Sequence, residues 1–230
     1  MSEKKPTIAV IGGTGNQGIG LSMRWYKAGY SLIIGSRDEN RAAQTANIIR
    51  DKLIKITNSA GIEGTGNLEA VIRSDVIVLT VPYAYQLETI RSISKALENK
   101  ILVDVTAPLV PPKVGTVQLP ENGSAVVAAQ NMLGDNVSVI AAFQNIAAQH
   151  LSNLEHNIDC DVLICGNKKA DREVVVKLAA AAGMKGWHAG PLANAAAAEA
   201  LTSVLIFINR AHKIKGAGIR ITDGTDNHEH

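Results

Sequence analysis

Aromatic residues and cysteines are scarce in this chain of 230 residues. Phe, Trp and Tyr make up 3% of it, so its hydrophobic fraction of 46% is mainly aliphatic. Proteins that bind nucleic acid usually set aromatic residues among basic ones, and neither such a stripe nor the formal net charge of +2 favours that function. Cys160 and Cys165 are five residues apart on a predicted strand and should face opposite sides. This spacing argues against a disulfide or a metal pair and favours buried, reduced thiols in a cytoplasmic protein.

Long hydrophobic runs are also missing. The charged residues 1–6 precede an apolar run that is too short for a signal peptide and that leads into glycines. Residues 193–208 are apolar, but Asn194 and Glu199 interrupt them and the stretch is short for a membrane span. We expect a buried packing helix there, no membrane segment, and a disordered tail over residues 223–230.

What the chain does contain is a glycine pattern at the end of a short apolar run, residues 7–11. Gly13, Gly15 and Gly18 have the Gly-x-Gly-x-x-Gly spacing, and an amphipathic segment over residues 19–28 follows at once. A strand, a tight turn and a helix start in this order can cradle a pyrophosphate, because free N–H groups and the positive end of the helix dipole face the anion. The pattern predicts a dinucleotide site; the alternative is a glycine turn without a ligand.

The end of the next apolar run, residues 30–34, indicates which dinucleotide. An NAD enzyme normally carries Asp or Glu there to bind the ribose 2′-hydroxyl. This chain has Ser36 and Arg37, and Arg41 follows on the same face of the next helix. Asp38 and Glu39 fall in the first helical turn, where they complement the helix dipole. The pattern favours NADP over NAD; the alternative is that both arginines are solvated surface charges.

Apolar runs alternate with helical patterns along the chain, which is typical of a parallel sheet covered by helices. The predicted fold is α/β: a Rossmann-like, doubly wound, mostly parallel sheet with a small C-terminal α/β extension, which extends the sheet or packs on its edge, and a long terminal helix. We expect an NADP-binding domain over residues 1–145 and a small domain over residues 146–222 that completes the substrate site. Residues 106–123 hold four prolines and should form an extended excursion.

The individual elements follow from the same patterns. Strands are expected at residues 7–11, 30–34, 61–64, 76–79, 101–104, 137–141, 162–165 and 185–188. Helices are expected at residues 19–28, 39–55, 68–73, 83–97, 124–132, 170–182 and 193–212, with Asn67 as a cap of the third.

Ligands of open α/β sheets lie beyond the carboxyl ends of the strands. This rule brings the glycine turn together with segments 36–37, 80–83, 107–110 and 143–146, which include Gln144, Asn145 and Ile146. Pro82 and Tyr83 directly follow the fourth strand, where the nicotinamide should pass, and Leu87 lies one turn further on the same helical face. Equally, Tyr83 and Tyr85 could be ordinary aromatic residues at a helix start.

Residues for acid–base catalysis are sparse. The chain has no Tyr-x-x-x-Lys pair after the sheet, no nucleophile elbow and no metal-ligand spacing. His150 and His156 lie in a predicted loop that could approach the site, but a lone loop histidine is more often a surface residue. An oxidoreductase of this kind should pass hydride between two cofactor rings, which needs stacking and orientation more than a protein acid or base. We therefore predict no catalytic side chain and no metal site.

Five segments of the chain, spread over nearly its whole length, resemble the family of coenzyme F420-dependent NADP oxidoreductases. They are residues 8–18, 34–37, 79–82, 107–111 and 189–193. The resemblance implies an NADP domain and a small C-terminal domain with F420 bound between them. By matching segments it assigns the pyrophosphate to Thr14, Gly15, Asn16 and Gln17, the 2′-phosphate to Ser36, Arg37 and Arg41, and the rest of the cofactor to Tyr83, Leu87, Val110 and Ala148. Residues 144–147, near the expected deazaflavin, depart from the His-Thr-Ile-Pro that other members can carry.

The function that the resemblance implies is reversible hydride transfer between NADP(H) and F420. Because acid–base residues are few, a non-catalytic sensor of the NADP(H) redox state is an alternative. An NADPH-dependent reductase of a flavin or of a small imine is another, although the short C-terminal part disfavours a buried imine site. The apolar last helix suits the interface of a homodimer.

Overall fold

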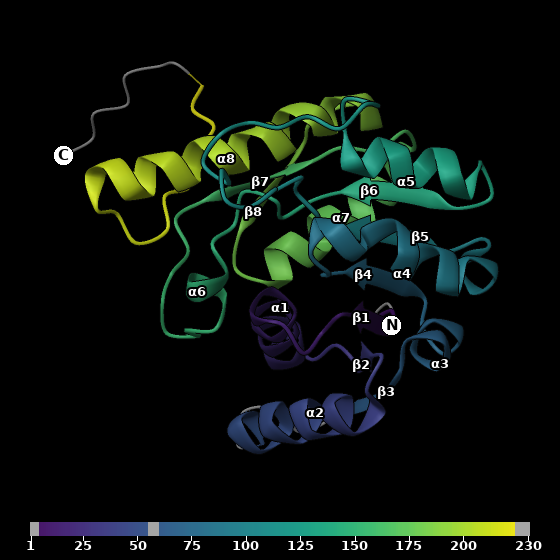
Figure 1. Cartoon of the computed structure of the whole chain (residues 1–230). Helices are drawn as coiled ribbons and strands as arrows, with labels where there is room; N and C mark the ends of the chain where they lie inside the picture. The colour runs from purple at the N-terminus through teal and green to yellow at the C-terminus, as the bar shows by residue number, and fades with distance from the viewer. Residues whose placement is uncertain (1–4, 55–59, 224–230) are drawn as a thin grey trace.

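The computed structural model describes residues 5–54 and 60–223 of the chain, and its main feature is a six-stranded parallel sheet (Figure 1). The strand order is β3-β2-β1-β4-β5-β6, so the chain winds outward from β1 in both directions. This is the Rossmann order, and it confirms the predicted fold. The strands are β1 (Ile8–Ile11), β2 (Leu32–Ser36), β3 (Ile62–Gly66), β4 (Val76–Leu79), β5 (Ile101–Asp104) and β6 (Ser138–Ala141).

Helices cover both faces of this sheet, and each face has its own hydrophobic core. Alternate residues of β1 show the division, because Ile8 and Val10 belong to one core and Ala9 and Ile11 to the other. Strands that are buried on both faces give continuous apolar runs, which is why most of them could be predicted. One face is covered by α1 (Asn16–Lys27), α2 (Glu39–Leu53) and α7 (Lys169–Ala181), and the other by α3 (Asn67–Ile72), α4 (Gln86–Ile93) and α5 (Ala125–Leu133).

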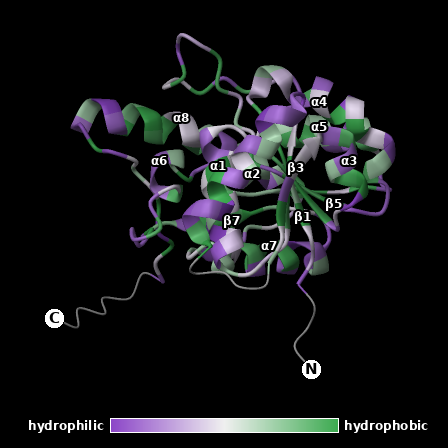
Figure 2. Ribbon diagram, turned by 90° about the horizontal axis from the view of Figure 1, so that it is seen from below, coloured by the Kyte–Doolittle hydropathy of each residue, from purple (hydrophilic) through white to green (hydrophobic). Residues whose placement is uncertain are grey.

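The last third of the chain packs on the edge of the sheet, as predicted. β7 (Asp161–Ile164) and β8 (Lys185–His188) pair in parallel as a separate two-stranded sheet. An antiparallel bridge between Ala141 and Cys165 joins this small sheet to β6. α8 (Ala195–His212) then packs against α5, and its last turns project beyond the body of the molecule (Figures 1 and 2).

α8 is less buried than the predicted packing helix. With the 3-10 turn before it, the helical stretch 192–212 is long and apolar enough to span a membrane by length and composition, and a third of it is buried. One such helix is weak evidence for a membrane, because core helices of soluble proteins pass the same test. The buried face includes Ala198, Glu199 and Leu205, whereas Phe207 is 61% exposed.

Several local predictions differ from the structure. Asn67 does not cap α3; Gly66, which has no side chain, occupies the cap position in an extended conformation, and Asn67 begins the helix. The helix predicted over residues 83–97 is divided, with α4 between two 3-10 turns. A short helix, α6 (Ala148–Leu151), lies in the predicted loop. Both cysteines are free, but only Cys165 is buried. Residues 224–230 of the predicted tail lie outside the described residues.

Candidate dinucleotide site

The glycine turn between β1 and α1 has the predicted geometry. Gly12 has a φ of +73°, which favours glycine, and the N–H groups of Gly12 and Gly13 donate to the carbonyl of Gly35 in β2 at 3.0 and 3.2 Å. A Cβ on Gly18 would lie 2.7 Å from both Gly13 Cα and Thr80 Oγ1. Gly18 therefore allows α1 to pack directly against the turn and the end of β4.

The N-terminus of α1 has no cap of its own. Gly15 occupies the cap position without a side-chain hydrogen bond, and the first turn carries no acidic residue. The caps of α2 and α5 differ, because Asp38 and Ser124 accept hydrogen bonds from backbone N–H groups of those helices. An uncapped N-terminus leaves N–H groups for an anion, so this end of α1 fits a pyrophosphate.

A cavity of about 370 Å³ lies at this helix start and at the carboxyl ends of β1, β2 and β4. Its size falls within the usual range for small-molecule sites. We call it the nucleotide cavity. It is lined by Gly12, Thr14, Gly15, Ser36, Arg37, Asp38, Arg41, Asn67, Thr80, Val81, Pro82, Tyr85 and Thr89. The structure thus brings together three segments that the sequence placed around one ligand.

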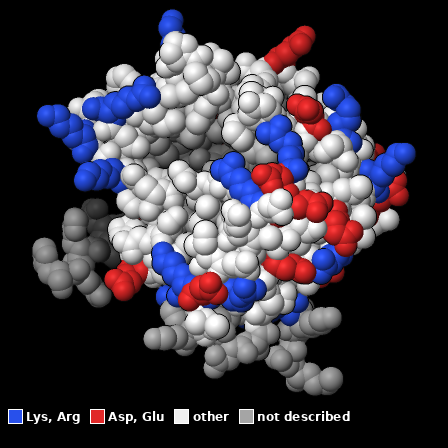
Figure 3. Space-filling model, turned by 60° about the horizontal axis from the view of Figure 1, so that its bottom comes forward, with Lys and Arg blue, Asp and Glu red and all other residues white. Residues whose placement is uncertain are grey.

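The basic side chains of the nucleotide cavity are available to an anion. The guanidinium of Arg37 lies 5.4 Å from the ring centroid of Tyr85. Asp38 accepts a hydrogen bond from the N–H of Arg41 at 3.1 Å and caps α2 from the position before the helix, whereas the sequence placed it in the first turn. Within the described residues, neither arginine forms an ion pair. Figure 3 shows basic side chains beside a hollow with largely uncharged walls.

Sequence reasoning missed Tyr85 and Asn67. Tyr83 was predicted because it directly follows the fourth strand, but in the 3-10 turn Tyr83–Tyr85 it is Tyr85 that lines the cavity. Asn67 follows β3 as Arg37 follows β2, so its place at a carboxyl end was the available signal. Its Oδ1 is buried without a hydrogen-bond partner in the described structure, which is unusual for an amide group.

A second cavity, of about 210 Å³, lies between α1, α8 and the segment that follows β6. Gln17, in the first turn of α1, belongs to this cavity and donates a hydrogen bond from Nε2 to the carbonyl of Phe143 at 3.0 Å. The first turn of α1 therefore lies between the two cavities. The second cavity is lined by Gln17, Leu109, Gln144, Asn145, Ile146, Ala147, Thr202, Leu205, Ile206, Asn209 and Ala217.

The amides of Gln144 and Asn145 are partly engaged with the backbone. Gln144 Nε2 donates to the carbonyl of Asp104 in β5 at 2.9 Å, and Asn145 Nδ2 donates to the carbonyl of Asp161 in β7 at 2.8 Å. Both side-chain oxygens are buried without a partner in the described structure. These residues tie the wall of the second cavity to both sheets, and their contact with a substrate stays a prediction.

The other predicted residues are not among those that line either cavity. Tyr83 is half-buried in its 3-10 turn, and Leu87 is exposed on α4. Val110 is exposed in the excursion over residues 106–123, and Ala148 begins α6 beside Ala147 of the second cavity. Asn16 begins α1 and is exposed. Their roles in binding also stay predictions, as does that of Gly13, which is buried in the turn.

Two buried carboxyl groups connect α4, α5 and α8 to the sheet. Asp104 accepts hydrogen bonds from Gln86 Nε2 at 2.6 Å and from the N–H of Thr106 at 2.9 Å. Glu199 of α8 accepts hydrogen bonds from Ser124 Oγ and from the first two N–H groups of α5, at 2.6 to 3.1 Å. Burial raises the pKa of both carboxyl groups above their ordinary values.

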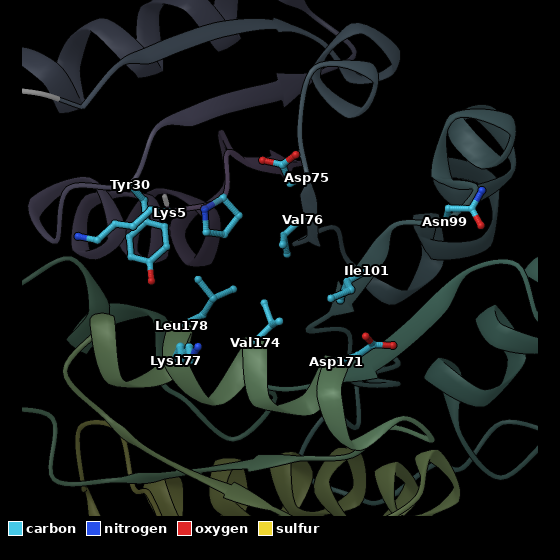
Figure 4. Close-up of a pocket in the computed structure, with 11 residues that line it drawn as sticks. Lys5, Tyr30, Asp75, Val76, Asn99, Ile101, Asp171, Val174, Lys177 and Leu178 are labelled. Atoms are coloured by element: carbon cyan, nitrogen blue, oxygen red, sulfur yellow. The ribbon is translucent and has the colours of Figure 1, made fainter. Parts of the chain in front are cut away.

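A larger cavity, of about 460 Å³, lies at the opposite end of the sheet (Figure 4). Its lining includes Tyr30, Asp75 and Ile101, which lie at or before the amino ends of β2, β4 and β5, together with one face of α7. Ligands of open α/β sheets bind at the carboxyl ends, so this cavity does not bear on the dinucleotide. Within residues 5–54 and 60–223, no group of three His, Cys, Asp or Glu residues could hold a metal ion.

Comparison with known proteins agrees with this geometry. A family model described as "NADP oxidoreductase coenzyme F420-dependent" matches residues 7–108, which include the whole glycine turn and the segment with both arginines. The chain is 37% identical to the F420-dependent NADP reductase of Methanocaldococcus jannaschii, over 94% of this chain and 98% of that one. It is also 37% identical to the F420-dependent NADP reductase of Methanothermobacter thermautotrophicus, over 94% of each chain.

Solved structures share the fold at lower identity. A chain from Arthrobacter sp. FB24 superposes with a TM-score of 0.77 at 21% identity, covering 94% of this chain and 99% of that one. The pyrroline-5-carboxylate reductase of Coxiella burnetii gives a TM-score of 0.57 at 14% identity, with 80% of this chain and 60% of that one covered. At these identities the likeness concerns the fold alone.

Proposed function

Because the chain belongs to the family of F420-dependent NADP reductases, we propose that it is an oxidoreductase that transfers hydride reversibly between NADP(H) and coenzyme F420. One observation carries the proposal: the start of α1 lies between two cavities, one with an uncapped helix N-terminus and two arginines that form no ion pair within the described residues, the other with an uncharged wall. Two cofactors bound in these cavities would approach each other across this helix start.

In this proposal the nucleotide cavity holds NADP(H). The N–H groups at the start of α1 bind the pyrophosphate, together with Thr14 and Gly15. Ser36, Arg37 and Arg41 bind the 2′-phosphate, and Tyr85 supports the guanidinium of Arg37. Pro82, which follows β4, lies where the nicotinamide half passes.

The second cavity receives F420, which is a co-substrate. When both cofactors are bound, the nicotinamide ring supplies or accepts the hydride. The side chains that line this cavity carry no titratable group, so we assign the accompanying proton to solvent rather than to a protein acid. The contribution of the protein is orientation: Gln17 and residues 144–147 set the position of the deazaflavin relative to α1.

We also propose the organisation that the sequence suggested. An NADP domain spans residues 1–145 and a small domain spans residues 146–222, with F420 between them. The protein acts in the cytoplasm as a homodimer through α8, without a nucleic-acid or membrane partner. The exposed apolar side chains on α8 support this arrangement.

The experiment that tests the function mixes the purified protein with NADPH and F420 and follows the absorbance of the deazaflavin. We expect its loss with NADPH and a far slower loss with NADH. Parallel reactions with free flavin and with a cyclic imine identify the acceptor. Binding of NADPH without turnover of any acceptor would contradict the proposal and would support a redox sensor instead.

A further inference from the structure

Arg24, near the end of α1, is a buried arginine with an unusual set of partners. It is 8% exposed, and burial lowers its pKa. Its guanidinium donates to five backbone carbonyls at 2.9 to 3.2 Å, and no carboxylate of the described residues pairs with it. The acceptors are the carbonyls of His150, Leu151, Asn153, His156 and Ala182. A buried charge costs free energy unless hydrogen bonds compensate it, so each of these carbonyls matters to the fold of this region.

Four of the five carbonyls belong to one segment, residues 143–156, which we call the wall segment. Its first part, residues 144–147, lines the second cavity. Its only helix is the four-residue α6, and Phe143 at its start has a φ of +68°. Within this segment the N–H groups of Ile146, His150 and His156 each donate to a carbonyl three residues earlier, so contacts with its neighbours must define the rest of its path.

One face of α1 supplies those contacts. Gln17, Gly20 and Arg24 have the i, i+3, i+7 spacing and therefore share a face. Gln17 donates to the carbonyl of Phe143, and a Cβ on Gly20 would lie 2.4 Å from Leu151 Cβ, so the helix and the wall segment touch closely at its middle. Arg24 completes this face. Thr14 and the N-cap residue Gly15, directly before the same helix, line the nucleotide cavity.

We propose that Arg24 is a positioning residue for hydride transfer: it holds the wall segment against α1 and so sets where F420 lies relative to the nicotinamide. This inference rests on the proposed function of the second cavity. α1 then positions both cofactors. Its N-terminus lies at the pyrophosphate, and its face with Gln17, Gly20 and Arg24 packs against the wall of the F420 site.

The test compares Arg24→Met with Lys27→Met. Lys27 lies in the same last turn of α1 and carries the same charge, but its contact with the wall segment is one exposed bond of 3.4 Å to the carbonyl of Leu154, against the four buried or part-buried bonds of Arg24. In Arg24→Met we expect KM for F420 to rise at least about tenfold and kcat to fall, with Kd for NADPH changed by less than about twofold. Lys27→Met should resemble the unmodified protein. Arg24→Lys, which can satisfy only some of the carbonyls, should give intermediate values.

Hydrogen exchange supplies a readout that does not depend on turnover. Amides of residues 144–156 should exchange faster in Arg24→Met than in Lys27→Met, while amides of β1 and β4 keep their protection. If Arg24→Met does not fold, Gly20→Ala, which crowds Leu151 and leaves Arg24 in place, should produce the same kinetic and exchange pattern. The proposal is overturned if the affinities for NADPH and F420 fall equally, or if exchange in residues 144–156 is unchanged. An unmodified protein that does not reduce F420 contradicts the proposed function alone, since the exchange experiment still tests the hold of Arg24 on the wall segment.

Discussion

Arg37 and Arg41 reach the nucleotide cavity from two different elements, the end of β2 and the first turn of α2. If they bind the 2′-phosphate, their contribution is specific to NADP(H), because NAD(H) has a hydroxyl at that position. Arg37→Ala and Arg41→Ala should each weaken NADPH binding by roughly 1.5–3 kcal/mol, the usual value of a charge-assisted hydrogen bond. NADH binding should change little. Titration of each variant with both nucleotides measures the difference.

The control for this experiment is Arg50→Ala, an exposed arginine further along α2 that contacts Asn47. It should leave the binding of both nucleotides unchanged. Equal losses of affinity for NADPH and NADH in the Arg37 and Arg41 variants would show that these arginines do not bind the 2′-phosphate.

Tyr85 and Tyr83 offer a second comparison, since both are tyrosines of the same 3-10 turn. Tyr85 lies in the wall of the nucleotide cavity, under the guanidinium of Arg37. A cation–π contact of this kind contributes about 0.5–1 kcal/mol. Tyr85→Ala should therefore weaken NADPH binding roughly two- to fivefold, and Tyr83→Ala should have a smaller effect. The reverse order would favour Tyr83, the residue that the sequence predicted.

These residues also show which parts of the site could be predicted from the sequence. The turn glycines, Ser36, Arg37 and Arg41 could be found because their spacing relative to a strand end is fixed by the Rossmann geometry. Tyr85 could not, because the choice between an α-helical and a 3-10 turn after Pro82 depends on packing. The hydrogen-bond partners of Gln144, the carbonyl of Asp104 and the hydroxyl of Thr202, lie 40 and 58 positions away in the chain, and no local pattern indicates them.

At the scale of elements, burial makes the ends of the central strands visible in the sequence, although β8, which has no buried residue, was also predicted correctly. β4, β5 and β8 begin and end at the predicted residues. β4 and β5 are central strands with almost every side chain buried, so their apolar runs have clear ends. α6 has four residues and no helical period, so its region was predicted as a loop. Asn67 was assigned to a cap from its residue type, but the cap position fell one residue earlier.

Glu199 shows that a buried carboxylate can fix the start of a helix, a contact that no sequence pattern indicates. Its carboxylate binds the N-terminus of α5, and burial raises its pKa from the ordinary value of 4.5. The folded protein therefore binds this proton more tightly than the unfolded chain does. The free energy of unfolding therefore gains a contribution as pH falls through the folded-state pKa, and it loses that contribution as pH rises through the same pKa.

Glu199→Gln removes this titration. Because the charge of Asp104 also raises the pKa of Glu199, the comparison reports Glu199 together with its effect on Asp104. Urea unfolding at pH 7 and pH 5 should show the native protein gaining stability relative to Glu199→Gln at the lower pH. A difference that stays constant, or that shrinks at pH 5, would contradict the raised pKa. Glu199→Ala, which leaves Ser124 and the helix N–H groups without their acceptor, should be less stable by roughly 1.5–3 kcal/mol.

At the scale of the whole molecule, the outer surface of α8 remains to be explained. Val204 and Phe207 are 43% and 61% exposed on this helix. The excursion over residues 106–123 reaches α8, since Gly115 lies close to the backbone of Phe207, and it adds exposed Val117 and Leu119. Exposed apolar side chains thus occur both on α8 and on the excursion that contacts it, which is the composition expected of an interface between subunits.

If a second copy covers this surface, a charge at its centre should separate the subunits without unfolding either of them. Phe207→Arg should therefore scatter light as a single chain of 24.3 kDa, whereas the native protein should have twice that mass. The matched control is Ile48→Arg, because Ile48 is also an exposed apolar residue, at 67%, but lies on α2. It should keep the native mass. A monomeric native protein would exclude the dimer. A native protein that sediments with lipid vesicles, and that Phe207→Arg releases from them, would assign this face of α8 to a membrane instead. This arm is needed because the length and apolar composition of the helix fit a membrane as well as a second subunit.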